Sequence, residues 1–293
     1  MMKRYIATIL ACLLTATVFA EEVDRTIDAS VDGHVEISNI AGSVTVIGWS
    51  RNSVEVTGTL GRNVEELVLE RDGDEITIKV KVPKRGGRGI DSDLLISVPQ
   101  ASSLDVGAVS ADIDVTDVLG EQSLHTVSGD VTTEHAGGDM EAESVSGDVE
   151  VSGDNSEGEI EASTVSGDVI LFRVSGEVSG ESVSGDVTVD EGSFDRAEMS
   201  SVTGEIVFNG ELRDDGKLSI ETVNGDVDVN FVGDLSARIE IDTFNGSIRN
   251  CFGPEAERTS KYAPGWELEF VEGDGDGRVE ISTMNGGVNI CRK

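Results

Sequence analysis

Apolar residues recur at fixed distances from a glycine that returns every 18 to 21 residues between Gly129 and Gly246. In most copies, apolar residues stand seven, five and two positions before this glycine and two and four positions after it. Alternation with a period of two predicts β-strands with one buried face, and the change of spacing before position minus two predicts a bend there. The turn glycines are Gly129, Gly147, Gly167, Gly185, Gly204, Gly225, Gly246 and Gly286.

This repeat predicts the fold class. A unit of about 20 residues cannot bury its own apolar face, so successive units must stack on one another. Val174–Val178 is a further copy of the turn that divides one period in half, which indicates two strands and two bends per coil. We therefore predict an all-β protein, a parallel right-handed β-helix (β-solenoid) with about 18–21 residues per coil. The alternative is an antiparallel meander or sandwich, although its hairpins would show alternating turn types.

The pattern divides the chain into three parts. Residues 1–20 predict a secretory signal peptide, with a basic start, an apolar run and small residues at its end. The alternatives at this end are a membrane-anchoring segment and a lipid on Cys12. Residues 21–108 predict irregular first coils and a cap, and residues 109–293 predict the regular solenoid with an excursion at 253–277. No later run is long and apolar enough to predict a transmembrane helix.

The composition is strongly acidic. Asp and Glu number 57 against 22 Lys and Arg, a formal net charge of −35, and loss of the two bases in the leader would make the chain more acidic still. Such a protein repels nucleic acid and anionic lipid, and it attracts divalent cations and cationic partners. We therefore predict no nucleic-acid binding. The basic run Lys79–Arg88 is interpreted as a solvated loop or as a docking site for phosphate-bearing envelope material.

An acidic residue follows most of the turn glycines, and a solenoid would place these side chains in a row about 4.8 Å apart. Carboxylates at this spacing repel by roughly 3–4 kcal/mol at an effective dielectric near 20. Hydrogen bonds from turn N–H groups can offset the repulsion, and so can bound Ca²⁺, which prefers oxygen ligands. Gly273–Gly277 also resembles a partial calcium loop. The Ca²⁺ candidates are Asp130, Asp148, Asp168, Asp186, Asp226, Asp274 and Asp276, and we expect no other cofactor.

Two cysteines occupy equivalent places in the repeat. Cys251 and Cys291 each follow a turn glycine by five residues. Adjacent coils would place them about 5 Å apart, within reach of a disulfide, whereas coils two apart would not. An exported protein meets oxidising conditions. We predict a Cys251–Cys291 disulfide, which requires residues 253–277 to leave the regular stack.

The sequence holds no arrangement typical of a catalytic site. His34, His125 and His135 are not spaced as zinc ligands, and Ser-Gly-Asp recurs as a turn rather than as a nucleophile motif. A carbohydrate-active enzyme needs clustered acids and aromatic platforms, but here the acids are spread along the repeat and aromatic residues are scarce. The excursion carries Tyr262 and Trp266, and it is interpreted as a cap or, alternatively, as a binding surface.

The recurring turns and the opening Val35–Trp49 resemble a known family. It is the bacterial group of exported β-strand-repeat proteins of unknown function, often labelled "putative adhesins". The resemblance covers nearly all of the mature chain, and it implies a right-handed β-helix at the cell envelope without established active-site residues. We expect a non-enzymatic exported protein of the periplasm or cell surface, structural or adhesin-like, that presents an acidic surface to an envelope protein or glycan. The alternatives are a carbohydrate-active β-helix enzyme and a calcium-stabilised structural module.

Overall fold

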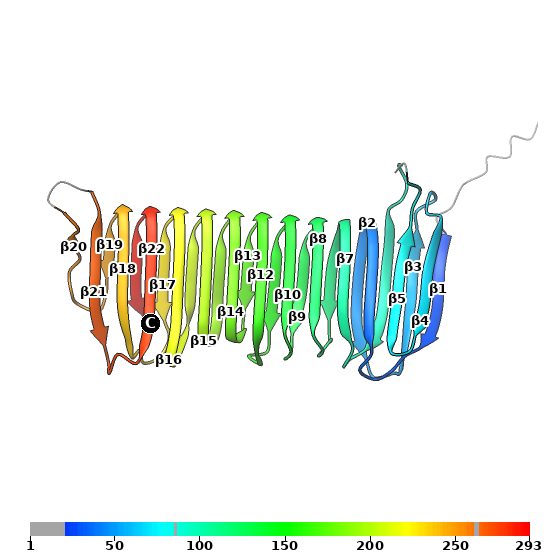
Figure 1. The fold of residues 1–293 in the computed structure, drawn as a ribbon, viewed down its shortest axis with the longest axis horizontal. Coiled ribbons are helices and arrows are strands. Elements are labelled where there is room, and N and C mark those ends of the chain that lie inside the picture. The colour runs from blue at the N-terminus through cyan, green and yellow to red at the C-terminus, as the bar shows by residue number, and fades with distance from the viewer. Residues whose placement is uncertain (1–20, 85–86, 261–263) are drawn as a thin grey trace, which may run out of the picture.

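The structure, a computed structural model, describes residues 21–84, 87–260 and 264–293. The predicted signal peptide, Arg85 of the basic run and Tyr262 of the excursion lie outside these residues. Every regular secondary-structure element in the described residues is a β-strand, which confirms the all-β expectation. The strands form one long mixed sheet that wraps into a rod (Figure 1). Among the described residues there is no helix with the length and apolar character needed to cross a membrane.

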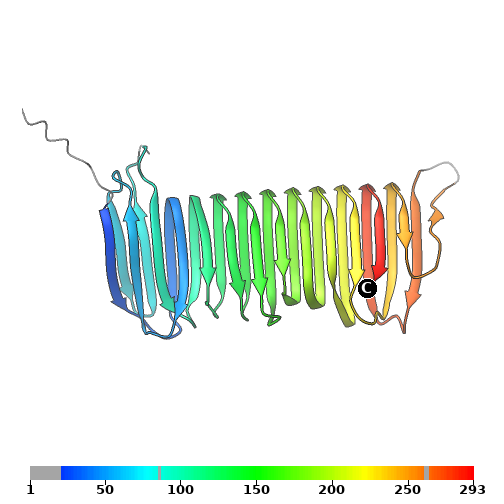
Figure 2. The same ribbon diagram turned by 180° about the vertical axis from the view of Figure 1, so that it is seen from behind.

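The middle of the rod consists of coils that each contribute two strands. These are β8 (Gln122–Ser128), β9 (Val131–His135), β10 (Met140–Ser146), β11 (Val149–Gly153), β12 (Glu157–Ser166) and β13 (Val169–Phe172). Each strand pairs in parallel with the equivalent strands of the coils before and after it, β10 with β8 and β12, and β11 with β9 and β13. Coils that are neighbours in the sequence are therefore neighbours in space here (Figure 2).

The following coils also pair in parallel, but in two of them the second bend lies within a continuous strand. They contain β14 (Ser175–Ser184), β15 (Val187–Thr203), β16 (Ile206–Asn224) and β17 (Val227–Phe231), and the register shifts where β14 and β15 turn the corner. Aromatic rings pack in the interior of these coils. The ring centre of Phe208 lies 5.5 Å from that of Phe194 and 5.9 Å from that of Phe231. Elsewhere Val, Ile, Leu and Ala from alternate strand positions make up most of the core, as the sequence pattern predicts.

At the N-terminal end, the order of coils in space differs from their order in the sequence. The strands are β1 (Glu21–Asp28), β2 (His34–Trp49), β3 (Ser53–Leu60), β4 (Glu66–Asp72), β5 (Glu75–Lys81), β6 (Ser92–Pro99) and β7 (Ser103–Thr116). β2 pairs in parallel with β7 on one side and with β5 and β6 on the other, so the first coil lies between later ones (Figure 1). β3 pairs antiparallel with β6, β1 pairs antiparallel with β3, and β4 pairs antiparallel with β5. Antiparallel strands therefore cover this end.

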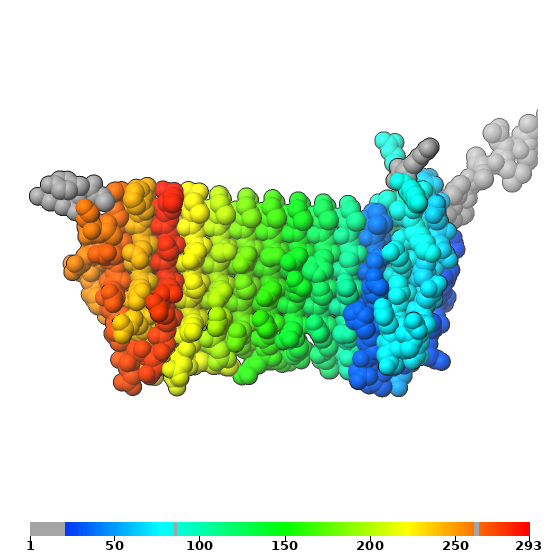
Figure 3. Space-filling model, viewed as in Figure 1, coloured from blue at the N-terminus to red at the C-terminus, as the bar shows by residue number. Residues whose placement is uncertain are grey.

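At the C-terminal end, too, the order of coils in space differs from their order in the sequence. Its strands are β18 (Ala237–Asn245), β19 (Ile248–Asn250), β20 (Glu257–Arg258), β21 (Trp266–Glu272), β22 (Gly277–Asn285) and β23 (Val288–Arg292). β22 pairs in parallel with β16 and β18, and β23 with β17 and β19, so the last coil is inserted between two earlier ones. Figure 3 shows it as a red band between yellow and orange bands. β21 pairs antiparallel with β18, and β20 with β21, so they cover the edge of β18.

The first bend of each central coil lies at the Gly-Asp pair, so the prediction of a bend before position minus two is wrong. The residue three before the glycine is a buried Ser or Thr, and the period-two alternation continues through it. The hydroxyl of Thr164 donates to the carbonyl oxygen of Gly147 in the preceding coil (2.9 Å), and that of Ser182 donates to Gly167 (3.0 Å). A Cβ on Gly167 would lie 2.2 Å from the Gly147 carbonyl oxygen, so close backbone approach requires glycine here.

The residue two before the turn glycine points into solvent. Val145, Val165 and Val183 are each 45% exposed. Their chain neighbours on both sides pair in register with the next coil, so these side chains stand in a row. In order along the rod, this apolar row consists of Val109, Val127, Val145, Val165, Val183, Val202, Val223, Met284 and Phe244. The usual arrangement is inverted at this corner, because the hydroxyl groups lie inside and the hydrocarbon lies outside.

Candidate functional site

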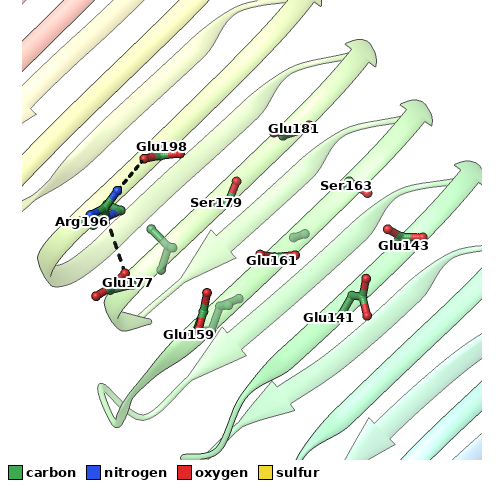
Figure 4. A pocket seen from close by; sticks show the side chains of 13 residues that line it. Glu141, Glu143, Glu159, Glu161, Ser163, Glu177, Ser179, Glu181, Arg196 and Glu198 are labelled. Carbon is green, nitrogen blue, oxygen red and sulfur yellow. Dashed lines mark hydrogen bonds and ion pairs between the residues drawn. The ribbon is translucent and has the colours of Figure 1, made fainter.

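One face of the rod is lined with glutamates from four successive coils (Figure 4). They project from the outward-facing positions of β10, β12, β14 and β15, because alternate residues of these strands face the core. The surface forms a shallow hollow of about 410 Å³. This glutamate face comprises Glu141, Glu143, Glu159, Glu161, Glu177, Glu181 and Glu198, together with Arg196, Ser163 and Ser179.

Glutamate and serine alternate from coil to coil over much of this face, although Glu141 pairs with Glu161 and Glu159 pairs with Glu177. Glu161 pairs in register with Ser179, and Ser163 pairs with Glu181. Ser179 in turn pairs with Glu198, and the alternation continues through β16 and β22. Like charges directly opposite one another on neighbouring strands destabilise a sheet. The alternation places a neutral serine beside most of these carboxylates, so a dense acidic surface is compatible with a stable sheet.

A column of cations borders the acids over the C-terminal half of the same face. Arg196 pairs in register with Lys217, Lys217 with Arg278, and Arg278 with Arg238. The equivalent positions of β12 and β14 hold glutamates instead. Arg196 contacts Glu198 at 3.2 Å, and exposed pairs of this kind contribute little to stability. They change the charge distribution, because the face carries only acidic charges over β10, β12 and β14 and charges of both signs from β15 onward.

The acidic residues that follow the turn glycines form a second row. The N–H of Asp148 donates to Oδ1 of Asp130 (2.9 Å), that of Asp168 to Asp148 (2.8 Å) and that of Asp186 to Asp168 (2.8 Å). Asp226 accepts in the same way from the inserted last coil. Such hydrogen bonds offset part of the repulsion along this Asp row. Within the described residues, no group of three or more His, Cys, Asp or Glu is arranged to hold a metal ion, and the Ca²⁺ alternative stays a prediction.

Glu205 occupies the Asp row between Asp186 and Asp226. Partial desolvation raises the pKa of Glu205 above its ordinary value although its side chain stays exposed, and a hydrogen bond with Asp228 and the nearby carboxylate charges raise this pKa further. A carboxyl group placed among carboxylates favours its protonated form. The N–H of Glu205 still donates to Oδ1 of Asp186 (2.7 Å), so the backbone pattern of the row continues through it.

The other two calcium candidates, Asp274 and Asp276, lie in the turn between β21 and β22, apart from the Asp row. The N–H groups of Asp274 and Gly275 both donate to the hydroxyl of Ser236 (3.1 Å each). The same hydroxyl lies 3.5 Å from Oδ2 of Asp276. These bonds hold the turn to the residue just before β18, so Ser236 is a structural partner that the sequence did not indicate.

The basic run lies at the N-terminal end of the rod, away from the glutamate face. Lys79 and Lys81 belong to β5, and Lys81 forms an ion pair with Glu66 of β4 (3.0 Å). The carbonyl oxygen of Arg88 accepts a hydrogen bond from the side chain of Asn63. The surrounding strands therefore hold parts of this run, and docking of phosphate-bearing material there stays a prediction.

Cys251 and Cys291 form a disulfide, with Cα atoms 4.9 Å apart, which is the pairing expected from their repeat positions. They lie on adjacent coils because the last coil is inserted beside β19. The excursion between them contains β20 and β21, where the Arg258 guanidinium lies 4.8 Å from the centre of the Trp266 ring. The disulfide therefore joins the inserted coil to the outermost one.

The structure does not bring the three histidines together. His34 begins β2, while His125 lies on β8 with its Nδ1 3.2 Å from Glu143. His135 is buried at the end of β9, and its Nε2 lies 2.9 Å from the carbonyl oxygen of Gly138. Sequence reasoning missed the glutamate face as a unit. The available signal was the alternation of Glu and Ser four and six positions before successive turn glycines.

Three solved bacterial structures resemble this chain over most of its length, at low identity and low TM-score. A "putative adhesin" from Bacteroides fragilis is 11% identical with a TM-score of 0.41, and the match covers 93% of this chain and 97% of that one. A "putative adhesin" from Parabacteroides distasonis is 12% identical with a TM-score of 0.37, covering 92% and 98%. A "putative cell adhesion protein" from Clostridium sporogenes is 10% identical with a TM-score of 0.22, covering 93% and 100%. No curated protein matches the sequence.

A protein-family model accounts for almost the whole described chain. It is named Toastrack DUF4097, and it matches twice, over residues 16–205 and residues 177–291. The two matches together span the glutamate face, the Asp row and the inserted last coil. The resemblance indicated by the repeated turns is thereby confirmed. The chain belongs to the Toastrack DUF4097 family.

Proposed function

We propose that this protein is a non-enzymatic, exported cell-envelope protein of adhesin-like character, which holds a partner along the acidic side of its rod. The observation that carries the proposal is the glutamate face, where side chains of one chemistry repeat in register on successive coils. A repeated surface suits an extended partner that makes many weak contacts at once. Catalysis instead needs a few groups that converge on one reacting atom.

Two further observations support the proposal. The disulfide between Cys251 and Cys291 suits an oxidising compartment outside the cytoplasm. The formal charge of −35 favours solubility and directs the rod toward cationic groups on a partner. The partner class that we propose is an envelope protein or glycan.

The architecture that goes with this role is a right-handed β-solenoid behind a cleaved leader at residues 1–20. Residues 21–108 would supply the first coils and the cap, and residues 109–293 the repeating part. Parallel pairing at a spacing of one coil supports this proposal, because crossover connections between parallel strands are right-handed in nearly all proteins.

Protease accessibility tests the location. The tagged protein is exposed to protease on intact cells and on cells whose outer envelope has been opened osmotically, with a cytoplasmic protein as the control. Digestion on intact cells supports an adhesin-like role at the surface. Protection until the envelope is opened would contradict adhesion to external partners and support a structural role in the periplasm. Recovery in the cytoplasm alone would contradict export altogether.

Two assays of the purified protein test the alternatives. We expect incubation with envelope glycans to produce no new reducing ends or unsaturated sugars, and their release would contradict a non-enzymatic role. We expect the melting temperature to be the same in Ca²⁺ and in chelator, because backbone N–H groups already bond to carboxylates of the Asp row. A higher melting temperature in Ca²⁺ would support the calcium-stabilised alternative.

A further inference from the structure

The apolar row forms one wall of a groove that follows the axis of the rod. The floor consists of buried hydroxyl groups, among them those of Ser144, Thr164 and Ser182. The opposite wall is the outward row four positions before each turn glycine. This wall consists of His125, Glu143, Ser163, Glu181 and Ser200. The groove has a volume of about 790 Å³.

The groove continues toward the C-terminal end into a second hollow. Ser200 and Val202 line both, and the second hollow has a volume of about 540 Å³. Its apolar wall contains Val223, Met284 and Phe244, which are 38%, 54% and 55% exposed. A continuous apolar strip of this kind on a soluble protein marks a binding surface. Met284 and Phe244 offer a large apolar side chain more contact area here than the valines do in the rest of the groove.

Carboxylates border the apolar row on both sides. On one side stand Glu143 and Glu181 of the opposite wall, and Glu221 in the second hollow. On the other side lies the Asp row, three positions farther along the chain. Two copies of this chain packed row against row would bring all these carboxylates together, and each copy carries a net charge of −35. Charge therefore opposes self-association through this groove and selects a cationic partner.

We infer that the groove binds an extended cationic polypeptide segment of another protein. Its apolar side chains lie against the apolar row, and its Lys or Arg side chains lie against the bordering carboxylates. The Phe244–Met284 hollow receives a large apolar residue at one end of the segment. This inference rests on the proposed binding function and specifies the chemistry of the partner.

The spacing of the carboxylates selects a backbone conformation. Glu143, Glu181 and Glu221 lie on alternate coils, which places them about 9.6 Å apart. A polyproline II helix rises about 3.1 Å per residue with three residues per turn, so every third side chain returns to the same side after about 9.3 Å. A β-strand repeats its facing after about 6.8 Å and does not match. The fitting ligand is a polyproline II segment with a cation at every third residue.

The test uses fluorescein-labelled peptides and the mature protein, with binding followed by fluorescence anisotropy. The probe repeats Lys-Leu-Pro, which supplies the spacing, the charge and the apolar side chains. A matched peptide repeats Lys-Ser-Pro, which removes the leucine side chains and keeps the charge and the proline spacing. We expect the first to bind about tenfold more tightly than the second.

Variants of the protein locate the contact. Val165→Ser combined with Val183→Ser should weaken binding of the Lys-Leu-Pro peptide about tenfold. The control is Ile170→Ser, since Ile170 is an exposed apolar residue (37%) on β13, outside the groove. Glu181→Gln should weaken binding, whereas Glu150→Gln on β11 should not. Melting curves of all variants check that the rod is intact.

Three results would overturn the inference. Equal affinity of the two peptides, or unchanged affinity of the double valine variant, would mean that charge alone attracts the peptide to the rod. Absence of binding by both peptides would mean that the groove does not take this class of ligand. None of these results bears on export or surface location, which the protease experiment on cells decides separately.

Discussion

The middle of the rod and its two ends are built from similar coils, but the coils are stacked in different orders. From β8 to β16, each coil stacks on the one that precedes it in the sequence. At the N-terminal end β2 lies between later strands, and at the C-terminal end β22 and β23 lie between earlier ones. Antiparallel strands then cover the outer side at each end. The ends therefore differ from the middle in the order of their coils and in the antiparallel strands that cover them.

The difference shows how a stacked fold limits its open edges. A parallel stack presents unpaired N–H and C=O groups at its first and last coils, and such edges invite pairing with other chains. Insertion of the last coil between two earlier ones gives its strands a hydrogen-bonded neighbour on both sides, so these strands do not form an edge of the sheet. The exposed edges are left to short or antiparallel strands. Four predictions test this contrast between the middle and the ends.

The largest effect is expected from removal of the disulfide that joins the inserted coil to the outermost one. Cys251→Ser with Cys291→Ser should cost about 4 kcal/mol, because the bond closes a loop of 40 residues in the unfolded chain. In a stacked fold each coil contacts only its neighbours, so the loss should be confined to the C-terminal end. Hydrogen exchange should rise around Ile290 and stay unchanged around Val151. A uniform rise along the rod would contradict this local coupling.

A substitution at a turn glycine should disturb the middle. Gly167→Ala should cost about 3 kcal/mol, because its Cβ would lie 2.2 Å from the Gly147 carbonyl oxygen and the two coils must separate. Gly107→Ala is the matched control, since a Cβ there has no atom within 4 Å. Urea unfolding of both variants gives the comparison. Similar losses in the two would mean that the close stacking of the coils is not what requires glycine.

A smaller effect is expected from the buried hydroxyl groups at the same corner. Thr164→Val removes the hydrogen bond to Gly147 (2.9 Å) and should cost about 1 kcal/mol. Thr222 occupies the same position in a later coil, but within the described part of the chain its buried hydroxyl has no hydrogen-bond partner. Thr222→Val should therefore leave the free energy of unfolding unchanged or raise it. Equal destabilisation by the two changes would show that shape, not hydrogen bonding, matters here.

The smallest effect concerns the pH dependence of stability at Glu205. Its pKa in the folded protein is raised above the ordinary value of 4.5 by partial desolvation, by a hydrogen bond with Asp228 and by the surrounding carboxylates. Protonation therefore stabilises the fold, and this contribution is complete below about pH 4.5 and is lost as the pH rises through the folded-state pKa. Glu205→Gln should raise the melting temperature at neutral pH and have less effect under acidic conditions. A gain that does not depend on pH would contradict the charge explanation.

Much of the candidate site could be predicted from residues within one repeat. The period-two alternation predicts which residues of β10 and β12 face outward, and the glycine spacing places Asp130 and Asp148 in one row. The apolar row could not be predicted in this way. Valine two positions before the glycine suits either a core or a strand exposed to solvent, and only the buried hydroxyl of the preceding residue decides between them.

The amino-acid pattern alone is enough to predict that this protein is built from strands, that its units stack, and that Cys251 and Cys291 occupy equivalent positions. Each of these follows from the spacing of residues within a repeat or between repeats. The order of the coils at the two ends is visible only in the three-dimensional fold. Every coil presents nearly the same turn and the same alternation, so local pattern does not specify which coil lies next to which. That choice depends on long-range pairing, which inserts the last coil and covers the edges with antiparallel strands.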